Sequence, residues 1–80
     1  MKTFNQLKPN DKLYIYNRLS KKISVYKVVT ALLNSKSETL DIEFIDDTLE
    51  EGVISITMAG ATKSRINLQS HIIFSTEPIQ

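Results

Sequence analysis

Ser70 and His71 are the only serine and histidine that stand next to each other in this 80-residue chain. A serine beside a histidine could supply a nucleophile and its base. However, neighbouring residues of a strand point to opposite faces of the sheet. Within a strand, the two side chains therefore cannot form such a pair, and we expect the last strand over residues 71–75. His71 is also the only histidine, which is a poor start for a metal site. We expect it to be a structural or surface residue.

A second group of reactive side chains is acidic and lies in one short stretch. Its members are Asp46, Asp47, Glu50 and Glu51. Carboxylates in this number could hold a hard cation or act as a paired acid and base. Their spacing differs from that of the calcium-binding loop, and no apolar residues surround them to raise the pKa of one carboxyl group. The stretch ends at Gly52 and is typical of a solvated turn between two strands.

The stretch over residues 59–64 reads AGATKS and contains a glycine followed by lysine and serine. A phosphate-binding loop needs a second glycine directly before the lysine, and a helix after it. Both are missing from the pattern. We therefore expect a tight turn around Gly60.

The strongest candidate for a binding site is the outer side of the first expected strand. Alternate residues of a strand share a face, which groups Lys12, Tyr14, Tyr16 and Arg18. Lys63 and Arg65 extend the basic side if their strand lies nearby. Aromatic side chains flanked by cations can anchor a protein partner or stack on single-stranded nucleic acid. The competing interpretation is structural: outward Asp41 and Glu43 would pair with the cations, and the tyrosines would cover the outside of the fold.

Composition narrows the functional classes. The net charge of +1 provides no overall field that would attract nucleic acid or an anionic membrane. Cysteine is absent, which excludes disulfides, thiolate catalysis and cysteine-ligated metals. The first ten residues contain no apolar run typical of a secretory signal. No stretch approaches the roughly 20 apolar residues of a membrane span.

Hydrophobic patterning predicts five or six short strands in a single domain over residues 1–80. We expect strands over residues 12–18, 23–33, 39–44, 53–58, 64–68 and 71–75. The second is apolar on both faces in places and should bend, with a bulge near Val28 and Val29; a short helix over residues 28–33 is the alternative. The positions expected to point inward are Leu13, Ile15, Leu40, Ile42, Phe44, Ile54, Ile56, Ile66 and Leu68. Closure into a small barrel would bury this face and remove exposed edges.

The N-terminal region is expected to form one helical turn and then a β-turn. Thr3 and Gln6 have capping-box spacing, which would direct Phe4 and Leu7 toward a core. Pro9, followed by asparagine and aspartate, favours a turn that leads into the first strand.

The stretch LKPNDKLYI, residues 7–15, resembles the opening of many small Src-homology-3-like barrels, which often begin L-K-x-G-D-x-V-Y-V. Asn10 stands where glycine is usual, and asparagine also tolerates positive φ. The layout as a whole resembles small barrel proteins of bacteriophages and low-GC bacteria. This resemblance implies a fold and transfers no catalytic residue.

The resulting expectation is an all-β, five- to six-stranded Src-homology-3-like barrel with a short N-terminal helical turn. We expect a non-enzymatic interaction or structural module, a phage-encoded accessory or virion component, that is cytoplasmic or virion-associated. The expected partner is a protein, contacted through the tyrosine-bearing strand. A nucleic-acid-binding barrel is the alternative, self-association is left open, and neither a cofactor nor a membrane is expected.

Overall fold

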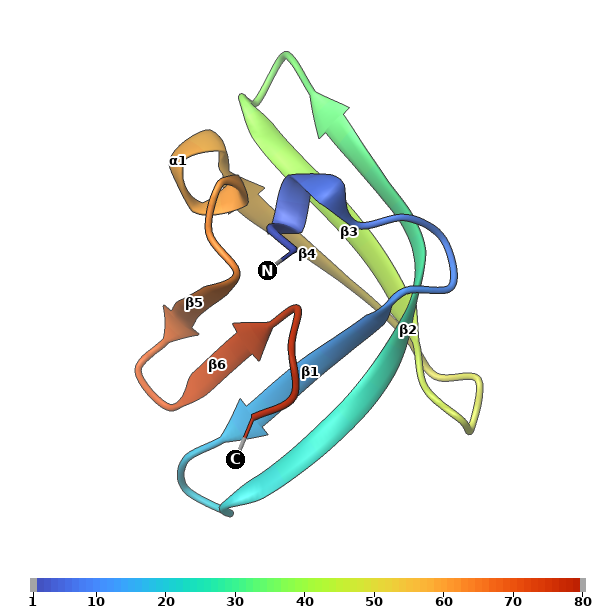
Figure 1. Ribbon diagram of the computed structural model, residues 1–80, viewed down its shortest axis with the longest axis vertical. Coiled ribbons are helices and arrows are strands. Elements are labelled where there is room, and N and C mark those ends of the chain that lie inside the picture. The colour runs from blue at the N-terminus through green and yellow to red at the C-terminus, as the bar shows by residue number, and fades with distance from the viewer. Residues whose placement is uncertain (1, 80) are drawn as a thin grey trace.

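The fold is a six-stranded antiparallel sheet that curls into a half-barrel (Figure 1). The computed structural model describes residues 2–79, apart from the side chain of Gln69. The strands are β1 (Lys12–Asn17), β2 (Lys22–Asn34), β3 (Thr39–Ile45), β4 (Glu51–Thr57), β5 (Arg65–Gln69) and β6 (Ile72–Ser75). Two short helices complete the fold, η1 (Phe4–Gln6) and α1 (Met58–Ala61). The strand order in the sheet is β4-β3-β2-β1-β6-β5. The predicted all-β, small barrel-like fold is therefore confirmed. The expected closure is wrong, because β4 and β5 do not pair and remain as edges of the sheet.

Strand β2 belongs to both halves of the sheet. Its first residues, from Lys22 to Lys27, pair with β1, and residues from Lys27 to Asn34 pair with β3. The register with β3 shifts between Val28 and Thr30, which is the bulge expected from the sequence. A bulge bends its strand and increases the local twist. The helix considered for residues 28–33 does not form, because these residues lie within β2.

The core lies on the concave side of the sheet. Eight of the nine positions predicted to point inward are buried or packed against this core, and the fully buried ones include Leu13, Ile42 and Ile56. The prediction for Leu68 is wrong, since 41% of this residue is exposed. The register between β5 and β6 shifts between Asn67 and Gln69, and this irregularity interrupts the alternation that the sequence pattern assumed.

The N-terminal region covers the core as expected. Phe4 is completely buried and Leu7 nearly so, and the backbone N–H of Thr3 donates to Gln6 Oε1 at 3.0 Å. The turn that follows places Asn10 at φ 76°, a conformation that asparagine tolerates better than most residues. Its neighbour Asp11 accepts a hydrogen bond from the backbone N–H of Lys8 at 2.8 Å.

The segment around Gly60 forms a helix, which corrects the prediction of a tight turn. Thr57 ends β4 and caps α1, because its hydroxyl accepts a hydrogen bond from the Gly60 N–H at 3.2 Å. Ala61 is buried against the core. Threonine is a favoured capping residue, and this signal is present in the sequence.

Three aromatic rings pack together in the core. Phe44 lies directly opposite Gly52 on β4, and a Cβ atom at Gly52 would come within 2.5 Å of the Phe44 ring. The glycine thus leaves the space that the ring occupies. Tyr26 and Phe74 enclose the same ring, with centroid distances of 5.0 and 6.5 Å. Phe44 therefore joins β2, β3, β4 and β6.

We predict that Phe44→Ala lowers the free energy of unfolding by roughly 3–5 kcal/mol, since it empties a core aromatic site. Leu68→Ala is the control, because the same alternating pattern placed both residues inside. The exposed Leu68 should cost well under 1 kcal/mol when truncated. Urea denaturation measures both values. An unchanged midpoint for Phe44→Ala, or equal losses in the two variants, would contradict this core.

Asp11 should make stability depend on pH. A hydrogen bond from Lys2, followed by one from the Lys8 backbone, holds the pKa of Asp11 below its usual 3.8. A carboxylate with a lowered pKa stabilises the fold above the unfolded pKa, and this stabilisation is lost as pH falls through the folded pKa. Asp11→Asn should therefore destabilise the protein at neutral pH, and the difference from the parent should shrink below pH 3.8.

The measurement is the urea midpoint of parent and variant across the acid range. Asp47→Asn serves as a control for the loss of an exposed carboxylate in a different turn. A constant difference between the Asp11 variant and the parent at every pH would show that ionisation of Asp11 does not stabilise this turn.

Candidate binding face

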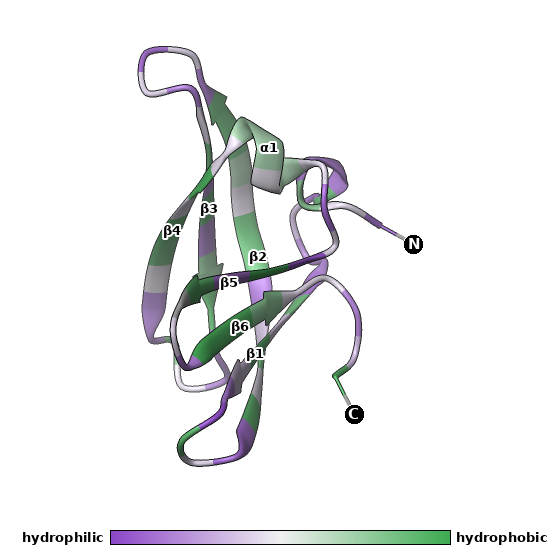
Figure 2. Cartoon of the chain, turned by 90° about the vertical axis from the view of Figure 1, so that its left-hand side faces the viewer, coloured by the Kyte–Doolittle hydropathy of each residue, from purple (hydrophilic) through white to green (hydrophobic). Residues whose placement is uncertain are grey.

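The outward side of β1 combines the two tyrosines with apolar residues from both neighbouring strands. Tyr14 lies opposite Val25 on β2. Tyr16 lies opposite Ile23 on β2 and opposite Ile73 on β6, and β6 is apolar along most of its length (Figure 2). We call these five residues the tyrosine face. Residues directly opposite one another have Cβ atoms about 4.5–5.5 Å apart, so these side chains form a continuous surface.

The tyrosine face is only partly covered. Ile23 and Val25 are 44% and 48% exposed, while both tyrosines and Ile73 are half-buried. The sequence-based site included the tyrosines and missed the three aliphatic residues. For Ile23 and Val25 the sequence did contain a signal, because β2 is apolar on both faces. From the sequence alone, this pattern predicted only that the strand bends. Contiguous exposed apolar residues rimmed by polar ones are typical of interaction surfaces.

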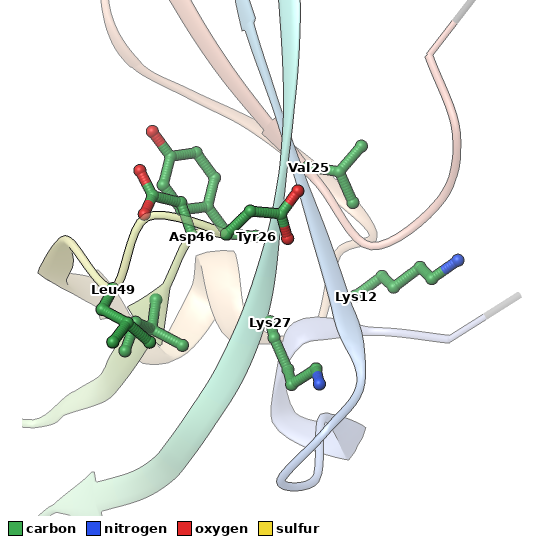
Figure 3. Close-up of a pocket in the computed structure, with 8 residues that line it drawn as sticks. Lys12, Val25, Tyr26, Lys27, Asp46 and Leu49 are labelled. Carbon is green, nitrogen blue, oxygen red and sulfur yellow. The ribbon is translucent and has the colours of Figure 1, made fainter.

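Two lysines lie at one end of the tyrosine face. Lys12 is directly opposite Lys27 in the register of β1 and β2. Like charges in this position destabilise a strand pair, so the fold does not benefit from them. Both lysines line a hollow of about 330 Å³ together with Val25, Tyr26, Ile45 and residues of the β3–β4 turn (Figure 3).

The remaining predicted basic residues do not join Lys12 on this face. Arg18 follows the end of β1 and lies in the turn, where its backbone N–H donates to the carbonyl of His71 at 2.8 Å. Arg65 is opposite Ser75, which is itself opposite Tyr14, so β6 separates the arginine from the tyrosines. Lys63 precedes β5, and both Lys63 and Arg65 line a second hollow, between β4 and β5.

The acidic residues that were expected to pair with these cations lie elsewhere, so that prediction is wrong. Asp41 is flanked by Leu32 and Ser55 across the strands, and Glu43 is flanked by Thr30 and Val53. Hydrogen bonds, first from Ser55 and then from Thr39 and Asn34, lower the pKa of Asp41. Within residues 2–79 the salt bridge that forms is Lys2–Asp11, at 2.7 Å. Lys12 and Lys27 make no such ion pair within residues 2–79, although the acidic Asp46 and Asp47 line the same hollow.

The acidic stretch between β3 and β4 is organised as a turn. The carboxylate of Asp46 accepts hydrogen bonds from the backbone N–H groups of Thr48 at 2.8 Å and Glu50 at 2.9 Å. The hydroxyl of Thr48 donates to the same oxygen, and this bond is the main cause of the lowered pKa of Asp46. The Asp46 carboxylate therefore stabilises the turn through hydrogen bonds. This agrees with the interpretation of the acidic stretch as a turn between two strands.

Ser70 and His71 lie in the turn between β5 and β6, whereas the sequence pattern predicted His71 within the last strand. The argument from alternating strand faces therefore does not apply to them. His71 is half-buried and fixes this turn through its carbonyl group. In the part of the chain that the structure describes, no three histidine or acidic residues are grouped closely enough to hold a metal ion.

The fold and the face together define a small all-β protein with an apolar, tyrosine-bearing outer surface. Comparison with family models, curated proteins and solved structures yields no match. Between residues 2 and 79 neither helix has the length and apolar character needed to cross a membrane.

Proposed function

We propose that this protein is a non-enzymatic interaction module that binds a partner protein through the tyrosine face. The observation that carries the proposal is the apolar surface on the convex side of β1, β2 and β6, where it does not contribute to the core. Protein interfaces have an apolar, aromatic centre and a polar rim. Tyr14 and Tyr16 lie at the centre, since strands on both sides flank them, and Lys12 and Lys27 form one end.

Tyrosines are suited to anchor such a contact. Their rings bury a large area at the cost of few torsions. Ile23 and Val25 flank them and can exclude water around the anchors. A purely structural role for the tyrosines would not need an exposed aliphatic row beside them.

Binding of single-stranded nucleic acid is the second candidate. The opposed Lys12 and Lys27 favour it, because an anionic ligand would relieve their mutual repulsion. Asp46 and Asp47 line the same hollow and weigh against it, since they already place negative charge there. Aromatic rings beside cations also form the platforms on which bases stack. We rank it second because the centre of the tyrosine face is aliphatic and the net charge of the chain is only +1.

The proposal extends to the kind of protein. We assign the chain to the small Src-homology-3-like barrels and to an accessory or virion role in a bacteriophage, acting in the cytoplasm or in the virion. The support is the resemblance of residues 7–15, in which Asn10 takes the positive φ where the motif usually has glycine.

We predict that replacing both Tyr14 and Tyr16 by alanine weakens partner binding by roughly 2 kcal/mol or more, the usual scale of interface anchors. Partners are captured from extracts of the native source with the immobilised parent protein, and their affinities are then measured by calorimetry. Stability should fall less, by roughly 0.2–1 kcal/mol for each cross-strand pair. Leu32→Ala with Val53→Ala is the matched control, since both residues are 65% exposed and lie on the other half of the sheet. Equal partner affinity of the parent and the tyrosine variant would show that the two tyrosines only pack against the sheet and do not bind the partner.

Salt distinguishes the two candidate ligands. For a protein partner, raising the salt concentration from about 0.05 to 0.2 M should change affinity only modestly, because few exposed charges take part. For single-stranded nucleic acid the same change should weaken binding severalfold or more, since counterions are released from the phosphates. Measurements with the captured partner and with labelled oligonucleotides of mixed sequence decide between them. Tight, steeply salt-dependent oligonucleotide binding would replace the protein-contact proposal.

A further inference from the structure

The sheet does not close, and the opening between its two edge strands forms a groove. Strands β4 and β5 stand at opposite ends of the strand order. They nevertheless face one another across one hollow, because the curled sheet brings its ends around (Figure 1). The short segment that connects them consists of α1 and residues 62–64. A groove of about 390 Å³ lies between them, lined by Ser55, Ile56 and Thr57 on β4, by Ala59 and Gly60 in α1, and by residues 63 and 65–68.

The β4 side of this groove is formed by Ser55, Ile56 and Thr57, the last part of a regular strand edge. Residues Glu51–Thr57 pair with β3 in unbroken register, without a bulge. Natural sheets usually protect an edge with a bulge, a proline or an inward-pointing charge. β4 contains no proline and its inward positions are Gly52, Ile54 and Ile56. The outer edge of β4 can therefore accept another strand through its backbone groups.

The groove also has a defined charge. Among the described residues that line it, Lys63 and Arg65 are cations and none is a carboxylate. The backbone of Lys63 is held in place, since its N–H donates to the Gly60 carbonyl at 3.0 Å and its carbonyl accepts from Phe4 at 2.9 Å. Both basic residues are exposed and so remain accessible to a ligand.

We infer that the groove binds an extended peptide segment that carries acidic side chains. The segment adds antiparallel to β4, the more stable arrangement per residue, and its carboxylates contact Lys63 and Arg65. Two observations favour a peptide over nucleic acid: a strand edge is available, and the lining contains no aromatic ring on which a base could stack. The inference does not depend on the tyrosine face.

The test uses two end-blocked, fluorescein-labelled peptides of alternating valine and threonine. One carries glutamates, and the other carries lysines at the same positions. Fluorescence anisotropy with the full chain should show at least tenfold tighter binding of the glutamate peptide. Lys63→Glu with Arg65→Glu should remove this preference, because like charges would then meet. Lys21→Glu with Lys36→Glu, at exposed positions in the β1–β2 and β2–β3 turns, is the charge-matched control and should bind as the parent does.

Amide hydrogen exchange locates the peptide. Bound glutamate peptide should slow exchange within Glu51–Thr57, and the Tyr14→Ala, Tyr16→Ala variant should bind it like the parent, which separates this site from the tyrosine face. Equal or absent binding of the two peptides, or protection only outside β4, would overturn the inference. So would concentration-dependent self-association in sedimentation experiments that the Lys63 and Arg65 substitutions abolish, because a second copy would then be the occupant.

Discussion

The bend in β2 is the constraint on which the rest of the structure depends. One strand of 13 residues pairs with β1 along its first half and with β3 along its second. The bulge at Val29 lies just after Lys27, where pairing passes from β1 to β3, so the two parts of the sheet can turn toward one another. Without this bend, a six-stranded sheet in a chain of 80 residues would leave one apolar face in water.

The bend also determines what can fill the concave side. Phe44 pairs with β2 just before the bulge and extends over Gly52, where a methyl group would collide with its ring. Phe4 and Leu7 from the N-terminal segment and Ala61 from α1 complete the core. The helix α1 spans the distance from β4 to β5 with few residues, and these two edges remain separated by a groove.

Two surfaces result from this architecture, and they differ in chemistry. The convex side of β1, β2 and β6 is apolar and aromatic, whereas the groove between β4 and β5 offers backbone groups and two cations. A single basic and aromatic patch, as the sequence suggested, would favour one ligand. The structure separates Lys63 and Arg65 from the tyrosines, so the aromatic and the basic residues belong to two different surfaces.

Much of the fold was determined by the sequence alone. Alternation placed Leu13, Ile42 and Ile56 inside, because side-chain direction in a regular strand follows from local geometry. The residue types likewise predicted the turn through Asn10 and the bulge near Val29.

Tertiary structure decided the features that depend on the register between distant strands. Leu68 turned outward at an irregularity that no local pattern marks, and Ile23, Val25 and Ile73 joined the tyrosines through pairing between distant segments. Lys63 and Arg65 lie in a separate groove because β6 lies between β1 and β5. Strand order depends on how the whole chain packs, and no local stretch of residues determines it.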